Sequence, residues 1–148
     1  MLVPEPASVQ LMCAVYSPGS SDLPSALARH LSPSRIRTLA LSGIEVLFVP
    51  AQWPDVRRYH WETLLAARAI ENQIFIAACN SCASDTHGGG SSRILDPLGS
   101  VLAALDTTEG VLSADIDLSV LADIRATINV YRDRRPELYQ VSDTPLRF

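Results

Sequence analysis

The chain has 148 residues, which is long enough for one domain with a buried core. It is 47% hydrophobic and 19% charged, a composition typical of globular proteins and unlike that of disordered ones. The formal net charge is −4, so we expect no nucleic-acid partner. No apolar run reaches the roughly 18–20 residues that a membrane span needs, and residues 1–10 lack the basic start of a signal peptide. We therefore expect a cytoplasmic protein with no membrane partner.

Residues 1–34 differ in character from the rest of the chain. They are rich in proline and serine, and no sustained hydrophobic periodicity runs through them. Residues 9–16 are compatible with one strand. We interpret the segment as an N-terminal extension that is either poorly integrated or a partly ordered strand and loop.

The clearest pattern lies in residues 35–54. The run IEVLFV at 44–49 is almost continuously apolar, which predicts a strand buried on both faces, as in parallel sheets. A helix is expected over 36–41, closed by Ser42 and Gly43. Because proline cannot donate to a strand ladder, we expect the strand to stop at Pro50.

The elements that follow predict an α/β fold. A helix over 55–72 and a second apolar strand over 74–79 would complete a strand–helix–strand unit, which makes the two strands parallel. The remaining expected elements are a polar loop at 80–90, a hairpin of strands 91–95 and 101–105 around a type I turn at 96–99, a strand at 111–116 and a helix at 118–128.

Two local patterns could suggest a metal or a phosphate, and we favour neither. Cys79 and Cys82 form one C-x-x-C, but no second ligand pair has zinc-site spacing. The glycines at 88–90 enter a strand rather than a helix, which indicates a tight turn. We expect no metal and no cofactor. Three cysteines without a secretory signal favour reduced thiols.

The turn after the 44–49 strand is the best candidate for a binding site. Ligands of open α/β sheets bind beyond the carboxyl ends of the strands, where PAQWP places a glutamine and a tryptophan between two prolines. We expect a substrate-binding wall made of Pro50, Ala51, Gln52 and Trp53. For Trp53 the residues alone leave two interpretations equally open, namely contact with substrate and core packing under the turn.

Four blocks of the chain resemble the C-terminal half of the nitrilase or carbon–nitrogen hydrolase family. They are LALSGIEVLFVPAQWP (39–54), HWETLLAARAIENQIFIAACN (60–80), GGGSSRILDPLGSVL (88–102) and RDRRPELY (132–139). The resemblance implies part of a four-layer α-β-β-α sandwich, with the family domain over 35–140 and a tail over 141–148. It also implies a homo-oligomer that pairs helical faces.

The family resemblance further implies hydrolysis of a non-peptide C–N bond in a linear amide or nitrile. The family uses a Cys nucleophile, a Glu base and a Lys that stabilises the tetrahedral intermediate. This sequence contains no lysine, and residues 25–34 show no trace of the family's cysteine motif. We therefore expect no catalytic residue here and describe the chain as a truncated carbon–nitrogen hydrolase, inactive alone.

Two alternatives stay open. In the first, the chain is a non-enzymatic binding or assembly subunit that completes a partner chain, because a half-sandwich would expose an apolar sheet face. In the second, it is a hydrolase with relocated catalytic residues that uses Cys13 as its nucleophile. The substrate itself, a small-molecule amide if there is one, is not indicated by the sequence.

Overall fold

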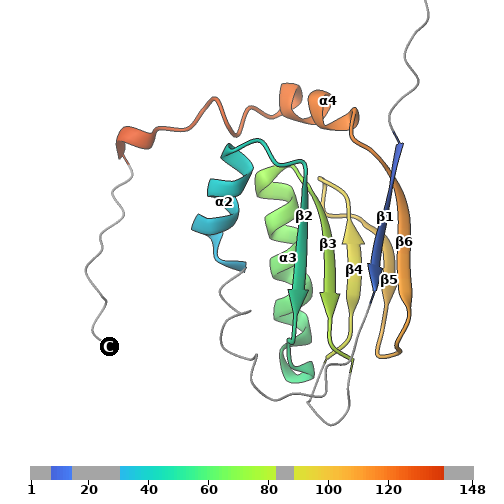
Figure 1. The fold of residues 1–148 in the computed structure, drawn as a ribbon. Coiled ribbons are helices and arrows are strands. Elements are labelled where there is room, and N and C mark those ends of the chain that lie inside the picture. Colours follow the sequence, from blue (N-terminus) through green and yellow to red (C-terminus); the bar gives the residue numbers. More distant parts are fainter. Residues whose placement is uncertain (1–7, 15–30, 83–88, 139–148) are drawn as a thin grey trace, which may run out of the picture.

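The computed structural model describes residues 8–14, 31–82 and 89–138, with the backbone alone for 8–14. In chain order the elements are β1 (Ser8–Ala14), α2 (Pro33–Leu41), β2 (Val46–Ala51), the 3₁₀ turn η2 (Asp55–Arg57), α3 (Arg58–Asn72), β3 (Phe75–Asn80), β4 (Ser92–Leu95), β5 (Val101–Leu105), β6 (Val111–Asp117), α4 (Val120–Thr127) and the 3₁₀ turn η4 (Pro136–Leu138). Helices α2 and α3 cover one face of a four-stranded sheet, and a two-stranded sheet lies beyond the other face (Figure 1).

The four-stranded sheet has the order β2-β3-β4-β5. Strands β2 and β3 are parallel, with Val46 opposite Phe75 and Ala51 opposite Asn80, which confirms the predicted strand–helix–strand unit. The next two pairings, β3 with β4 and β4 with β5, are antiparallel. This topology brings the end of β2, the end of β3 and the start of β4 to the same end of the sheet.

Strand β3 separates two hydrophobic cores. Its side chains alternate between them: Ile76 and Ala78 pack with Trp61 and Leu65 of α3, whereas Phe75 and Ala77 pack toward the two-stranded sheet. Every β3 residue except Cys79 is buried. A strand inserted between two apolar layers has no polar face, which explains why its sequence is a continuous apolar run.

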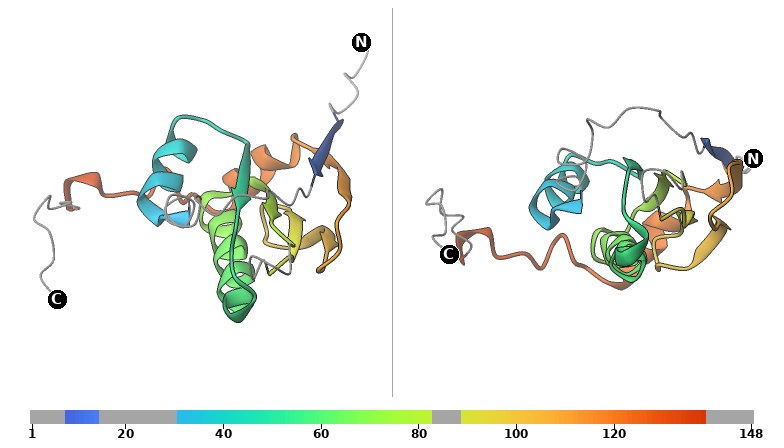
Figure 2. Two further views of the ribbon diagram at one scale, coloured as in Figure 1. Left: turned by 60° about the horizontal axis from the view of Figure 1, so that its bottom comes forward. Right: turned by 90° about the horizontal axis from the view of Figure 1, so that it is seen from below.

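The two-stranded sheet and α4 form the layer beyond this second core. Strands β1 and β6 are antiparallel, with Ser8 opposite Asp117 and Ala14 opposite Val111, so residues 1–34 do contribute a strand. Helix α4 lies across the end of the strands, as the two further views also show (Figure 2). The described residues therefore form a mixed α/β layered fold: helices, a four-stranded sheet and a two-stranded sheet.

Strand β2 was expected to stop at Pro50, but it continues to Ala51. The carbonyls of Glu45 and Ala51 accept hydrogen bonds from the β3 side, from the amides of Phe75 and Ser81 (2.9 and 3.0 Å). Because backbone groups alternate between the two edges of a strand, Pro50 faces the outer edge, where its missing N–H breaks no ladder bond.

The predicted helix 55–72 is also modified. Its first turn is the 3₁₀ segment η2, and the α-helix begins only at Arg58. The helix ends at Asn72, where Gln73 adopts a left-handed conformation (φ 48°). In the part of the chain that the structure describes, no helix combines the length and hydropathy needed to cross a membrane.

Candidate functional site

The side chain of Asn80 holds the backbone of Trp53 at the end of the sheet where β2 and β3 both terminate. The Trp53 N–H donates to Asn80 Oδ1 (2.5 Å), and Asn80 Nδ2 donates to the Trp53 carbonyl (3.0 Å). Asn80 Nδ2 also donates to the Gly90 carbonyl (2.7 Å). Asn80 is 2% exposed, so these bonds are shielded from water. One buried amide thus fixes both the turn after β2 and the strand entry before β4.

The Trp53 side chain is half-buried and rests on the core. Its ring centroid lies 5.8 Å from that of Trp61, and its Nε1 donates to the Arg57 carbonyl (2.7 Å). Trp61 is 1% exposed, and its own Nε1 donates to the Ser91 carbonyl (3.0 Å). Trp53 therefore packs against the core under the turn, and part of its ring is exposed.

Gly89 and Gly90 run close against the turn and the β5–β6 connection. The Gly89 N–H donates to the Trp53 carbonyl (2.9 Å), and a Cβ at Gly89 would lie 2.9 Å from the Asp55 backbone. A Cβ at Gly90, whose φ is +56°, would lie 2.0 Å from the Asp106 carbonyl oxygen. Gly89 and Gly90 therefore allow a close backbone approach, while Gly88 of the predicted tight turn lies outside the described residues.

The other residues predicted for the wall have different surroundings. Pro50 is exposed at the outer edge of β2, while Ala51 and Gln52 are half-buried. The Gln52 side-chain oxygen is a buried acceptor without a hydrogen-bond partner among the described residues. The structure thus brings Gln52 and Trp53 together at the strand ends and places Pro50 at the side of the sheet.

A charged cluster lies beside the turn. Glu62 Oε1 accepts hydrogen bonds from Ser91 Oγ and Arg93 Nη2, both at 2.5 Å. The pKa of Glu62 is lowered chiefly by the hydrogen bond from the Ser91 hydroxyl; burial opposes this effect, and the charge and hydrogen bond of Arg93 add to the lowering. A carboxylate whose pKa is lowered accepts a proton less readily, so Glu62 is a poor general base.

The cysteines near this edge form no recognisable catalytic or metal site. Cys79 is disulfide-bonded, so the expectation of reduced thiols is wrong for this residue, whereas Cys82 is free and half-buried. Across residues 31–82 and 89–138, no three His, Cys, Asp or Glu side chains gather as metal ligands would. The side chain of Cys13 lies outside the described part of the chain.

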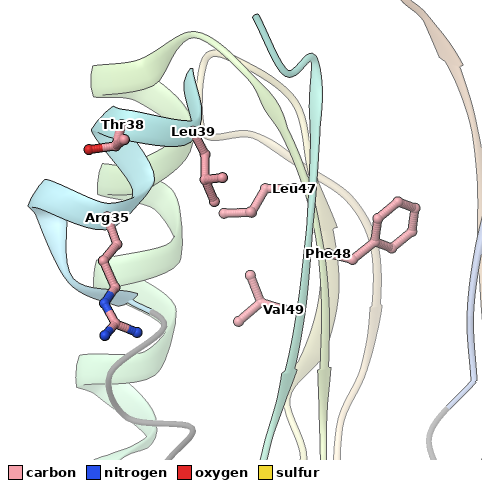
Figure 3. A pocket seen from close by; sticks show the side chains of 6 residues that line it. All are labelled: Arg35, Thr38, Leu39, Leu47, Phe48 and Val49. Carbon is pink, nitrogen blue, oxygen red and sulfur yellow. The ribbon is translucent and has the colours of Figure 1, made fainter. Parts of the chain in front are cut away.

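A separate groove of about 430 Å³ lies between α2 and the outer edge of β2. It is lined by Arg35, Thr38, Leu39, Leu47, Phe48 and Val49. Leu39, Leu47 and Val49 point into the space between the helix and the strand, whereas Phe48 points to the opposite face of the sheet (Figure 3). The groove thus adjoins the edge of β2 that pairs with no other described strand, and it is distinct from the Trp53 turn.

The fold and the order of the sequence blocks indicate a protein of the carbon–nitrogen hydrolase type. Residues 26–126 match the sequence profile of the carbon–nitrogen hydrolases. The chain belongs to the carbon–nitrogen hydrolase family.

Curated relatives include two kinds of amidase. The chain is 48% identical over 109 residues to the 2-oxoglutaramate amidase of Bacillus subtilis, a match that covers 72% of this chain and 42% of the relative. It is 34% identical over 97 residues to the omega-amidase YafV of Escherichia coli, covering 63% of this chain and 38% of the relative. The chain thus spans less than half the length of these relatives.

Solved structures give the same assignment. The Caenorhabditis elegans NitFhit protein is 31% identical, with a TM-score of 0.68 over 76% of this chain and 28% of that one. A carbon–nitrogen hydrolase from Helicobacter pylori is 25% identical, with a TM-score of 0.64 over 76% of this chain and 45% of that one. The layered α/β arrangement described above is therefore that of nitrilase-superfamily folds.

Proposed function

We propose that this chain is the C-terminal part of a carbon–nitrogen hydrolase, that it builds one wall of an amide-binding pocket, and that it hydrolyses no amide alone. The observation that carries this proposal is the Asn80 amide that fixes the Trp53 turn at the carboxyl ends of β2 and β3. A preorganised turn at this edge is what a ligand site requires. The turn is assembled, yet the 148 residues contain no lysine for the oxyanion.

The chemistry of the described residues supports inactivity of the chain alone. Attack on an amide in the manner of this family uses a thiolate, a base that accepts the thiol proton and a cation or donor that offsets the oxyanion. Glu62 is already engaged by Ser91 and Arg93, and Cys79 is disulfide-bonded. The free Cys82 forms no hydrogen bond with a carboxylate among the described residues, so an activated nucleophile and its base would come from outside the part of the chain that the structure describes.

The proposed substrate is a small linear amide. Relatives named 2-oxoglutaramate amidase and omega-amidase support this class. Among the described residues, Gln52 Oε1 is buried and has no hydrogen-bond partner, so it is an acceptor that an amide N–H would satisfy, and the Trp53 ring offers an apolar surface for a short chain. Pro50 and Ala51 would serve as the rigid backbone of the same wall.

A second candidate function is a non-enzymatic assembly subunit that completes a partner chain. The observation that favours it is the exposure of Phe48, 59%, on a strand whose outer edge pairs with no other described strand. Under either proposal the chain works in the cytoplasm and associates with another polypeptide, either its own copy or a complementing chain.

Reconstitution tests the proposed function. The purified chain is mixed with the portion of the Bacillus subtilis relative that it does not cover, expressed separately, and ammonia release from 2-oxoglutaramate is measured. We expect release from the mixture and from neither part alone. Trp53→Phe should retain most of this activity, and Trp53→Ala should lower it by about tenfold or more, the cost of misplacing a substrate. Activity of the mixture that is insensitive to Trp53→Ala would contradict the wall.

A further inference from the structure

A second cavity, of about 280 Å³, lies at the end of the sheet opposite the Trp53 turn. At this end β3 begins, β4 ends and β6 leads into α4. Phe75 and Ile116, which are 3% and 2% exposed, form its buried part, whereas Leu98 and Leu102 are 60% and 43% exposed. The cavity therefore has a buried apolar interior and further apolar surface that is left in contact with solvent.

The described lining of this cavity contains three carboxylates and no basic side chain. The carboxylates belong to Asp96, Asp115 and Asp117. Asp96 Oδ1 accepts hydrogen bonds from the N–H groups of Leu98 and Ser100 (2.9 and 2.8 Å), and Asp117 Oδ1 accepts one from the N–H of Ser119 (2.8 Å). These backbone donors hold two of the carboxylates in place. We call the site the aspartate-lined cavity; its charge suits a cationic partner that also carries an apolar group.

Residues 132–138, which we call the arm, carry the complementary groups. Arg132 and Arg134 form no ion pair among the described residues, whereas Arg135 is paired with Glu137. Leu138 is 66% exposed at the end of η4. The arm runs past α2, on the side of the molecule away from β6, so it lies far from the aspartate-lined cavity of its own chain (Figures 1 and 2). It thus presents two guanidinium groups and one apolar side chain to a neighbour.

We propose that the arm of a second copy of this chain docks in the aspartate-lined cavity, with Arg132 and Arg134 against the carboxylates and Leu138 in the apolar interior. The arm and the cavity lie on opposite sides of one chain, so each copy can give its arm and receive the arm of the other. Mutual exchange of this kind closes a two-fold dimer and leaves neither surface exposed. The inference goes beyond the proposed function and does not depend on it.

The two kinds of contact have different roles in this docking. Ion pairs between exposed groups add little affinity, but they orient the partners and disfavour wrong ones. Burial of Leu138 against Leu98 and Leu102 supplies most of the affinity, because these three side chains are all exposed in the single chain. The dimer should therefore weaken as salt screens the charges, yet persist in part at high salt.

Sedimentation velocity of the full chain tests the docking when charges are exchanged between the two surfaces. The arm variant carries Arg132→Asp and Arg134→Asp, and the cavity variant carries Asp115→Arg at an exposed position. We expect each variant alone to self-associate at least about tenfold more weakly than the parent, because like charges then meet. An equimolar mixture should regain association to within about threefold of the parent, because each arm then meets a cavity of opposite charge.

Matched variants separate these surfaces from general effects of charge and hydrophobicity. Glu109→Arg makes the same charge change as Asp115→Arg at an exposed position in the β5–β6 connection and should alter association by less than about twofold. Leu138→Ser should weaken association by at least about fivefold, whereas Val56→Ser, at a side chain that is 89% exposed on η2, should alter it by less than about twofold.

Two results would overturn the proposal. One is a parent chain that stays monomeric, and the other is a mixture of the arm and cavity variants that associates no better than either variant alone. Far-UV circular dichroism shows whether both variants are folded. If a charge reversal unfolds the chain, Arg132→Gln and Asp115→Asn remove charge without reversing it, and each must then weaken association by at least about threefold for the proposal to stand.

Discussion

The side-chain amide of Asn80 takes the place of a neighbouring strand for the backbone of Trp53. Its oxygen accepts from the Trp53 N–H and its nitrogen donates to the Trp53 carbonyl, so one residue satisfies both polar groups of a turn where the ladder has ended. The same nitrogen reaches the Gly90 carbonyl. The orientation of the Trp53 turn is thus set by a residue 27 positions further along the chain.

Replacing Asn80 with alanine should destabilise the fold. The variant removes the side-chain partner of the Trp53 N–H and of the buried Gly90 carbonyl, while the Trp53 carbonyl keeps its bond from the Gly89 N–H, and the loss costs about 2–4 kcal/mol in the free energy of unfolding. Urea denaturation monitored by tryptophan fluorescence measures this loss. Asn129→Ala, a half-buried asparagine remote from the turn, is the control and should stay within about 0.5 kcal/mol of the parent. Similar losses of unfolding free energy in both variants would contradict a stabilising role for the Asn80 side-chain hydrogen bonds.

Gly90→Ala should be more damaging than Gly43→Ala. Both glycines have positive φ, +56° and +95°, so both substitutions carry a backbone penalty of at least about 1–2 kcal/mol. Only at Gly90 would the new Cβ meet another atom, the Asp106 carbonyl oxygen at 2.0 Å, whereas at Gly43 it would meet open space. We expect a further loss of about 1–3 kcal/mol at Gly90. Equal midpoints of thermal unfolding for the two variants would contradict the close approach.

Glu62→Gln should destabilise the protein at neutral pH and have less effect in acid. The pKa of Glu62 is lowered by the Ser91 hydroxyl and by Arg93, so its stabilising contribution is complete above the carboxyl's ordinary pKa near 4.5 and is lost as pH falls through the folded value. The side chain is 36% exposed, so after allowance for solvent screening we expect about 1 kcal/mol at pH 7.

Urea unfolding at pH 7 and at pH 3.5 compares this variant with the parent. The difference between the two proteins should be smaller at the lower pH. Glu109→Gln, which changes an exposed carboxylate in the β5–β6 connection, serves as the control. A Glu62→Gln effect that is the same at both pH values would show that the carboxylate charge does not stabilise the cluster.

Tyr131→Phe tests whether the Tyr131 hydroxyl attaches the segment after α4 to the end of α3. The Tyr131 hydroxyl donates to the Asn72 carbonyl at the end of α3, and Arg37 and Arg125 each lie 5.6 Å from the ring centroid. Removing the hydroxyl while keeping the ring should cost about 0.5–1.5 kcal/mol. Tyr59→Phe changes a tyrosine that is 76% exposed and should cost nothing measurable. An equal effect of the two variants in thermal unfolding would contradict the attachment.

Local patterns predicted much of this fold because they reflect burial. The apolar runs that predicted β2 and β3 follow from packing between the layers of the fold. The boundary at Pro50 was wrong because a strand's two edges are not distinguishable in a single sequence. Whether a proline breaks a strand depends on which edge it faces.

The sequence alone predicted only some residues of the candidate site. Gln52 and Trp53 follow directly from the end of an apolar run, whereas Asn80 was assigned to the start of a polar loop. The available signal was an asparagine placed at the end of a buried strand, but its partner in the turn lies far away in sequence. The Glu62–Arg93 pair, 31 residues apart, depends in the same way on the tertiary fold.

Ammonia release by the purified 148-residue chain alone, with 2-oxoglutaramate as substrate, tests the central claim most directly. Under conditions in which the Bacillus subtilis amidase turns over, we predict release no faster than the protein-free blank. Turnover above that blank, retained after a second purification step, would contradict the claim that the chain is a pocket wall without its own catalyst.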